Sequence, residues 1–104
     1  MRDRLANAEV RVKEGVAWLD KHWPDWLDRV DPLAIDVGSV DYSPLTMASG
    51  QPLTEVMDTK GLTMDDLEAL GFACATIDVH ALNYKWAEEI EGRLEAIERL
   101  WNNA

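Results

Sequence analysis

Eight apolar residues in the last quarter of the chain recur every three or four positions. They are Val79, Leu82, Trp86, Ile90, Leu94, Ile97, Leu100 and Trp101. At 3.6 residues per turn, this spacing places them on one stripe along about six turns of helix, with glutamates on the other side. The pattern predicts an amphipathic helix over residues 79–102, with Asp78 as its N-cap.

A second apolar stripe lies near the amino end of the chain. Leu5, Ala8, Val12, Val16 and Leu19 are again three or four positions apart, which predicts an amphipathic helix over about residues 4–22. Pro24 should end this helix, because a proline disfavours the α conformation at the residue before it.

The stretch DKHWPDWLDRVD, residues 20–31, is either an aromatic binding surface or a corner between helices. Pro24 suits the first position of a new short helix, and Asp31 can cap a single turn that begins at Pro32. Because Trp23 also continues the first stripe, we interpret the stretch as a helix corner. Trp18 lies off that stripe without an assigned covering element, and it is our candidate for an aromatic recognition residue.

Residues 31–78 have no sustained apolar period and are rich in glycine and proline. We expect one or two short helices there, one of them beginning at Pro52. A further helix is expected over about residues 63–70, with Thr63 as cap, Asp66 completing a capping box and Gly71 ending it. The sequence therefore predicts a single all-α domain over residues 1–104, with two long amphipathic helices and two or three short ones in an irregular middle.

The net charge of −10 is concentrated in that middle. Residues 1–30 carry six acids and six bases, whereas residues 31–78 carry nine acids and only one base, Lys60. Coulomb repulsion disfavours direct binding of this block to nucleic acid and favours a partner protein with a basic surface. The alternative is that the acids serve only solubility. The candidate partner-binding carboxylates are Asp36, Asp41, Glu55 and Asp58.

Motifs for chemistry are lacking. A single cysteine, Cys74, excludes an internal disulfide, and two histidines 58 residues apart form no zinc motif. No calcium loop, nucleophile elbow or phosphate loop is present. We therefore expect no enzyme activity, no metal and no cofactor. The absence of a long apolar run and of a signal-peptide core predicts a cytoplasmic protein that does not insert in membranes.

The end of the last predicted helix is a candidate surface for self-association. Leu94, Ile97, Leu100 and Trp101 extend the stripe beyond what a chain of 104 residues readily covers. They could pack on a second copy and form a homodimer. The alternative is that the first helix is long enough to cover them.

The order of features resembles a family of small uncharacterised proteins from actinobacterial phages and prophages. That family has the pattern GAxLLDxxxPGWxxxIDLxxLDL, then a cysteine-containing turn ending in LGQ, then GF, then YxxLTxxWxxxIxxR. The matching residues here are Gly15, Leu19, Asp20, Pro24, Trp26, Val30, Asp31, Leu33, Asp36, Gly50, Gln51, Gly71, Phe72, Leu82, Trp86, Ile90 and Arg93. The segment VDYSPLTMASGQ lacks the family's cysteines, so a thiol or metal role in that turn cannot apply here.

The resemblance implies a small phage-type protein that acts in the bacterial cytoplasm by binding a host protein, and it offers no catalytic residues to transfer. Combined with the charge pattern, it leads to the expectation of a non-enzymatic protein that binds a host or phage protein through residues 31–78. If the bound surface normally holds nucleic acid, the acidic block would compete for it. The alternative is a self-associating structural protein without a charge-driven partner.

Overall fold

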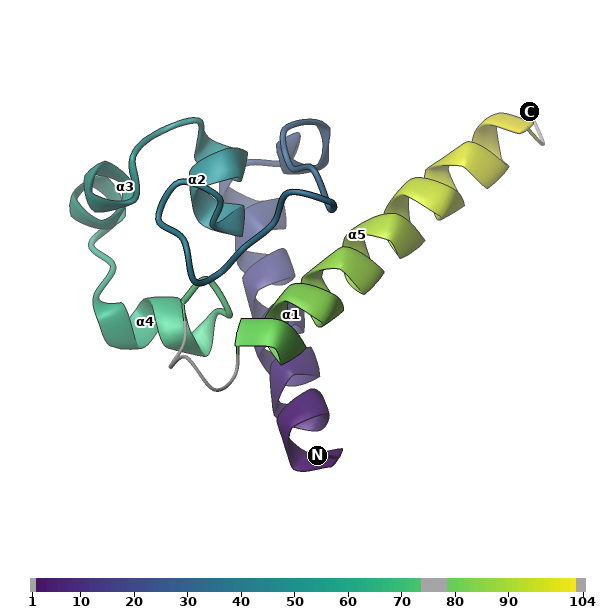
Figure 1. Cartoon of the computed structure of the whole chain (residues 1–104). Coiled ribbons are helices and arrows are strands. Elements are labelled where there is room, and N and C mark those ends of the chain that lie inside the picture. Colours follow the sequence, from purple (N-terminus) through teal and green to yellow (C-terminus); the bar gives the residue numbers. More distant parts are fainter. Residues whose placement is uncertain (1, 74–78, 103–104) are drawn as a thin grey trace.

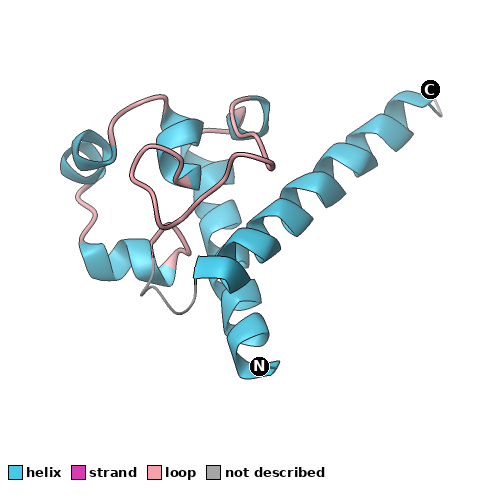
Figure 2. Ribbon diagram, viewed as in Figure 1, coloured by secondary structure: helices cyan, strands magenta, loops and turns pink. Residues whose placement is uncertain are grey.

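The computed structural model describes residues 2–73 and 79–102 of the chain, and these residues are predominantly helical (Figures 1 and 2). The elements are α1 (Arg2–His22), the 3-10 helix η1 (Trp26–Asp28), α2 (Pro44–Ser49), α3 (Leu53–Lys60), α4 (Met64–Ala69) and α5 (Val79–Asn102). Within the described ranges there is no strand, so the predicted all-α class is confirmed. Cys74, the predicted cap Asp78 and the side chain of Leu5 lie outside the described part.

The two long helices cross and pack against each other along their predicted stripes (Figure 1). From α1, the stripe residues Val12, Val16 and Leu19 are buried. From α5, Trp86 is fully buried, and its indole N–H donates a 2.7 Å hydrogen bond to the carbonyl of Gly71. The buried indole therefore has the hydrogen-bond partner that its polar N–H requires.

α4 and α5 both approach the backbone of α1 closely at Gly15, in the middle of α1. A Cβ atom at this position would lie 2.1 Å from the backbone carbonyl oxygen of Leu70 and 2.9 Å from the Trp86 ring. Only glycine leaves room for the end of α4 and the indole of α5 to reach the α1 backbone. Gly15 therefore sets the distance between three helices.

The middle of the chain forms short helices that cover one side of the α1–α5 pair (Figure 1). The predicted cap of α4 is confirmed: the Thr63 hydroxyl accepts from the Asp66 N–H, and the Asp66 carboxylate accepts from the Thr63 N–H. The helix predicted to begin at Pro52 starts one residue later, with Pro52 at the N-cap. These helices and the segment after α4 supply buried side chains to the same core: Leu45, Ala48, Val56, Leu67 and Phe72.

The stretch from Asp20 to Asp31 is a helix corner, as interpreted from the sequence. α1 ends at His22, and the next short helix begins at Trp26 rather than at Pro24. Trp26 is fully buried and donates from its indole nitrogen to Asp20 Oδ1 at 2.9 Å. Asp31 accepts a hydrogen bond from the Leu33 N–H and so caps the following turn.

Asp20 also joins the corner to α5. The Arg93 guanidinium donates two hydrogen bonds to its carboxylate, at 3.0 and 3.2 Å, and lies 5.8 Å from the centre of the Trp26 ring. Burial raises the pKa of Asp20, but the hydrogen bonds from Trp26 and Arg93 and the positive charge of Arg93 outweigh it and hold the pKa below the ordinary 3.8. Asp20 and Trp26 of the corner are thus tied to Arg93 of α5, which is 73 positions from Asp20 in the sequence.

This arrangement gives a pH-dependent prediction for Asp20→Asn, which keeps an acceptor for Trp26 and removes the charge. A carboxylate with a lowered pKa contributes stability at pH values above its unfolded pKa, and this contribution is lost as the pH falls through the folded value. The thermal midpoint of the variant should lie below that of the parent protein at neutral pH. The difference should shrink as the pH falls below 3.8.

Circular dichroism melts across acidic and neutral pH measure this difference. Glu9→Gln, which removes an exposed ion pair with Lys13 on α1, is the control and should shift the midpoint much less. A difference between Asp20→Asn and the parent protein that stays constant down to pH 2 would contradict the role of the charge.

Candidate functional site

The acids of residues 31–78 take part in none of the ion pairs within the described residues. Six residue pairs lie within 4.0 Å, and every one joins an acid and a base from residues 1–30 or 79–104. The charges of the two long helices are thus largely compensated locally. The negative charge of residues 31–78 has no such compensation among the described residues.

Lys60, the only base of residues 31–78, is directed toward α1 rather than toward the acids of its own segment. Its ammonium group lies 5.1 Å from the centre of the Trp23 ring, at the end of α1. A cation over an indole is attracted by the negative face of the ring. Lys60 therefore connects α3 with α1 and forms no ion pair with the neighbouring carboxylates within the described chain.

Some carboxylates of the middle have structural roles. Asp31 and Asp66 cap turns, and Asp36 accepts hydrogen bonds from the Gly38 N–H at 2.9 Å and the Asn83 side chain at 3.3 Å. The remaining described acids of this region are exposed and make no side-chain hydrogen bond among the described residues. They are Asp41, Glu55, Asp58, Asp65 and Glu68, and we call them the free acids.

The four carboxylates selected from the sequence therefore fall into two groups. Asp41, Glu55 and Asp58 belong to the free acids, with Asp41 on the loop before α2 and the other two on α3. Asp36 instead joins its own loop to α5, because its carboxylate accepts from the Asn83 side chain. Its N–H closes the same loop by donating to the Tyr42 carbonyl at 2.9 Å. A substitution of Asp36 would disturb this loop, so it is a poor reporter of partner binding.

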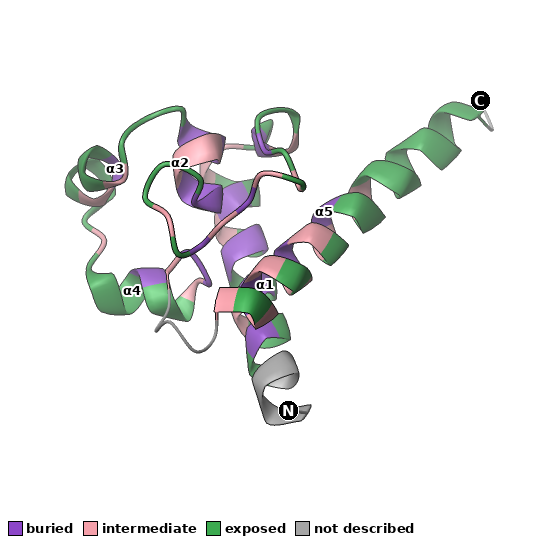
Figure 3. Cartoon of the chain, viewed as in Figure 1, coloured by how far each residue is buried: buried purple, intermediate pink, exposed green. Residues whose placement is uncertain are grey.

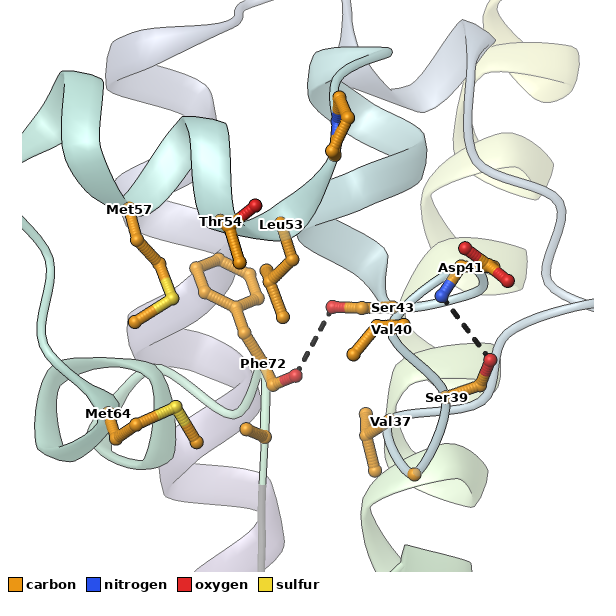
Figure 4. A pocket seen from close by; sticks show the side chains of 13 residues that line it. Val37, Ser39, Val40, Asp41, Ser43, Leu53, Thr54, Met57, Met64 and Phe72 are labelled. Carbon is orange, nitrogen blue, oxygen red and sulfur yellow. Dashed lines mark hydrogen bonds between the residues drawn. The ribbon is translucent and has the colours of Figure 1, made fainter.

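A pocket of about 440 Å³ opens between the Val37–Asp41 loop and α3 (Figure 4). Its wall is mainly apolar, and Figure 4 shows Met57, Met64 and Phe72 reaching it from three different segments. Asp41 is the one carboxylate among the described lining residues. This pocket could not be predicted from the sequence, because the apolar residues of residues 31–78 have no period that would indicate which of them share a wall.

Trp18, the predicted recognition residue, is half-buried at the end of α1. Its ring stacks on His22 with centroids 4.1 Å apart and meets the edge of Phe72 at 5.8 Å. Burial, together with the charges of Lys60 and Lys21, lowers the pKa of His22 and favours the neutral ring. Trp18 thus has the covering side chains that the sequence left unassigned, while part of its surface remains open.

The C-terminal part of α5 runs beyond the body and is exposed (Figure 3). The four predicted self-association residues belong to this end of the helix. Leu94 and Ile97 are about two-fifths exposed, and Leu100 and Trp101 are more than 70 % exposed. α1 does not cover them, so the alternative that the first helix is long enough to cover these four residues is wrong. Their role in self-association stays a prediction.

Groups suited to metal binding or membrane insertion do not occur in residues 2–73 and 79–102. No three side chains of His, Cys, Asp or Glu in these ranges lie close enough to hold a metal ion. None of the helices described there combines the length and the apolar character that a bilayer crossing requires. Comparisons with protein-family models, curated proteins and solved structures found no match to this chain.

Proposed function

We propose that this chain is a non-catalytic protein that binds the basic surface of a host or phage protein through its acidic middle, residues 31–78. The observation that carries the proposal is the distribution of ion pairs. All six described pairs lie in the flanking segments, while five exposed carboxylates of the middle have no cationic partner among the described residues. A surface with Lys and Arg side chains would supply those partners.

Exposed ion pairs are individually weak, at about 0.2–1 kcal/mol each. The free acids alone would therefore give a weak complex that salt readily disrupts. The apolar pocket adds a second kind of contact, because Asp41 belongs both to its lining and to the free acids. A basic segment could place an apolar side chain in the pocket and a neighbouring Lys or Arg near Asp41.

The proposal includes a consequence for nucleic acid. Proteins that hold DNA or RNA present basic surfaces to the phosphates. An acidic protein bound to such a surface would exclude the nucleic acid by occupying the same cations. The resemblance to small phage proteins agrees with a host protein as the target of this competition.

The test is a variant in which three free acids are neutralised: Asp41→Asn, Glu55→Gln and Asp58→Asn. The matched control, Glu9→Gln, Glu88→Gln and Glu95→Gln, changes the net charge equally but removes acids that already pair with Lys13, Lys85 and Arg99. All six positions are exposed, so both variants should fold. Tagged proteins are used to capture partners from an actinobacterial lysate at about 50 mM and about 300 mM salt.

We expect the parent protein and the control to capture the same partner at low salt, and to lose it at high salt. The triple variant should capture about tenfold less at low salt, which corresponds to roughly 1.4 kcal/mol. Added duplex DNA should release the partner. Equal capture by both variants would show that the acids serve solubility alone, and an empty capture at low salt would refute the proposal.

A further inference from the structure

The end of α5 forms a surface that the acidic middle does not explain. Beyond Ile90, which is fully buried, the helix continues away from the body for three more turns, and its predicted apolar stripe is uncovered (Figures 1 and 3). We call Leu94, Ile97, Leu100 and Trp101 the α5 face. Together they expose an apolar area of the order of several hundred Å², the size of a functional patch on a monomer.

The charges beside the α5 face are all negative on one edge. At about 100° per residue, Glu91 and Glu98 both lie within about 60° of Leu94, one above the other and about 10 Å apart. Neither takes part in an ion pair or a side-chain hydrogen bond within the described residues. The nearest cation on the opposite edge, Arg93, is already paired with Asp20 and Glu89.

We propose that the α5 face binds an amphipathic helix of a partner protein that has Lys or Arg residues along one edge of its apolar stripe. The apolar residues of two such helices pack at a spacing of three and four. Cations seven residues apart on the partner then lie opposite Glu91 and Glu98. This surface is separate from residues 31–78, so the inference does not rest on the proposed function.

A second copy of this chain fits the α5 face less well. In an antiparallel pair of α5 helices, Glu91 and Glu98 of each copy lie along the same edge as those of the other, and each molecule has a net charge of −10. The charge therefore favours a cationic partner over self-association.

The experiment uses two synthetic helical peptides of about 20 residues with leucine at every first and fourth position of a heptad. One has lysine along both edges, and the other has glutamate at the same places. Fluorescence anisotropy of the labelled peptides measures their binding to the full chain. We expect the lysine peptide to bind and the glutamate peptide to bind at least about tenfold more weakly, because its charges repel those of the helix edge.

The apolar contact is tested by Ile97→Gln with Trp101→Gln, against Val10→Gln with Leu33→Gln as the control. Val10 and Leu33 are 60 % and 89 % exposed and lie elsewhere on the molecule, so both double variants remove apolar surface without opening the core. The first should weaken binding of the lysine peptide at least about tenfold, because two large apolar side chains are no longer buried. The control should change it less than about twofold.

The edge charges are tested by Glu91→Gln with Glu98→Gln, against Asp41→Asn with Asp58→Asn, which changes the net charge equally. The first pair should weaken peptide binding severalfold more than the second. An equal effect of the two pairs would show that the peptide merely senses total charge, and would overturn the inference. A dimer in light scattering that Trp101→Gln converts to monomer would also overturn it, since a second copy would then occupy the face.

Discussion

Trp86→Ala is expected to lower the free energy of unfolding by about 3–5 kcal/mol, a large part of the 5–15 kcal/mol of an ordinary domain. Trp86 is fully buried, stacks on Phe72 at 5.7 Å and meets the edge of Trp26 at 6.4 Å. Its loss leaves a cavity where α1, α5 and the corner meet, and leaves the Gly71 carbonyl without its donor. Urea denaturation followed by circular dichroism measures the change.

Trp101→Ala is the matched control, because it removes the same side chain from the same stripe of α5. Trp101 is 78 % exposed, so its substitution should change the free energy of unfolding by no more than about 0.5 kcal/mol. Trp86→Phe, which keeps a ring and removes the donor, should fall between the two. Equal losses for Trp86→Ala and Trp101→Ala would contradict the burial of one and the exposure of the other.

Gly15→Ala should also destabilise the protein, by about 1–3 kcal/mol, although alanine is the better helix former. The added Cβ would lie 2.1 Å from the Leu70 carbonyl oxygen, so α4 and α1 must move apart. The same substitution at Gly92, on the exposed part of α5, meets no atom within 4 Å. Gly92→Ala should raise the free energy of unfolding by about 0.5–1 kcal/mol, because it removes the entropic cost of a helical glycine.

Thermal melts should show a lower melting temperature for Gly15→Ala and a higher one for Gly92→Ala if α1 and α4 are in contact as described. A rise in the melting temperature of Gly15→Ala would show that α1 and α4 are farther apart. Since the chemical change is identical, helix propensity cannot account for a difference between the two variants.

The long helices could be predicted from the sequence because their information is local. The apolar residues of α5 recur at the helical period from Val79 to Trp101, and the observed helix is Val79–Asn102. The Thr63–Asp66 capping box could also be predicted, because both partners lie within four residues.

Contacts between distant residues could not be predicted in this way. The side chain that covers Trp18 could not be predicted, because Phe72, whose ring contacts that of Trp18, is 54 positions away in the sequence. Asp36 could not be separated from the other middle acids, because its hydrogen-bond donor Asn83 comes from α5. The excess of acids over residues 31–78 can be counted from the sequence alone, whereas the separation of the free acids from the structural ones requires the fold.

The separation of charge has a consequence for how the molecule turns in solution. Residues 31–78, which include α2–α4, have most of the net negative charge, while the acids and bases of α1 are nearly balanced. Such a distribution gives the protein a permanent electric dipole. In the field of a basic partner, this dipole would orient the molecule before contact, so that residues 31–78 face the partner. A larger fraction of collisions would then lead to binding, which raises the association rate. In the proposed complex, the position of the six described ion pairs outside the middle would thus govern the orientation of the encounter as well as the strength of binding.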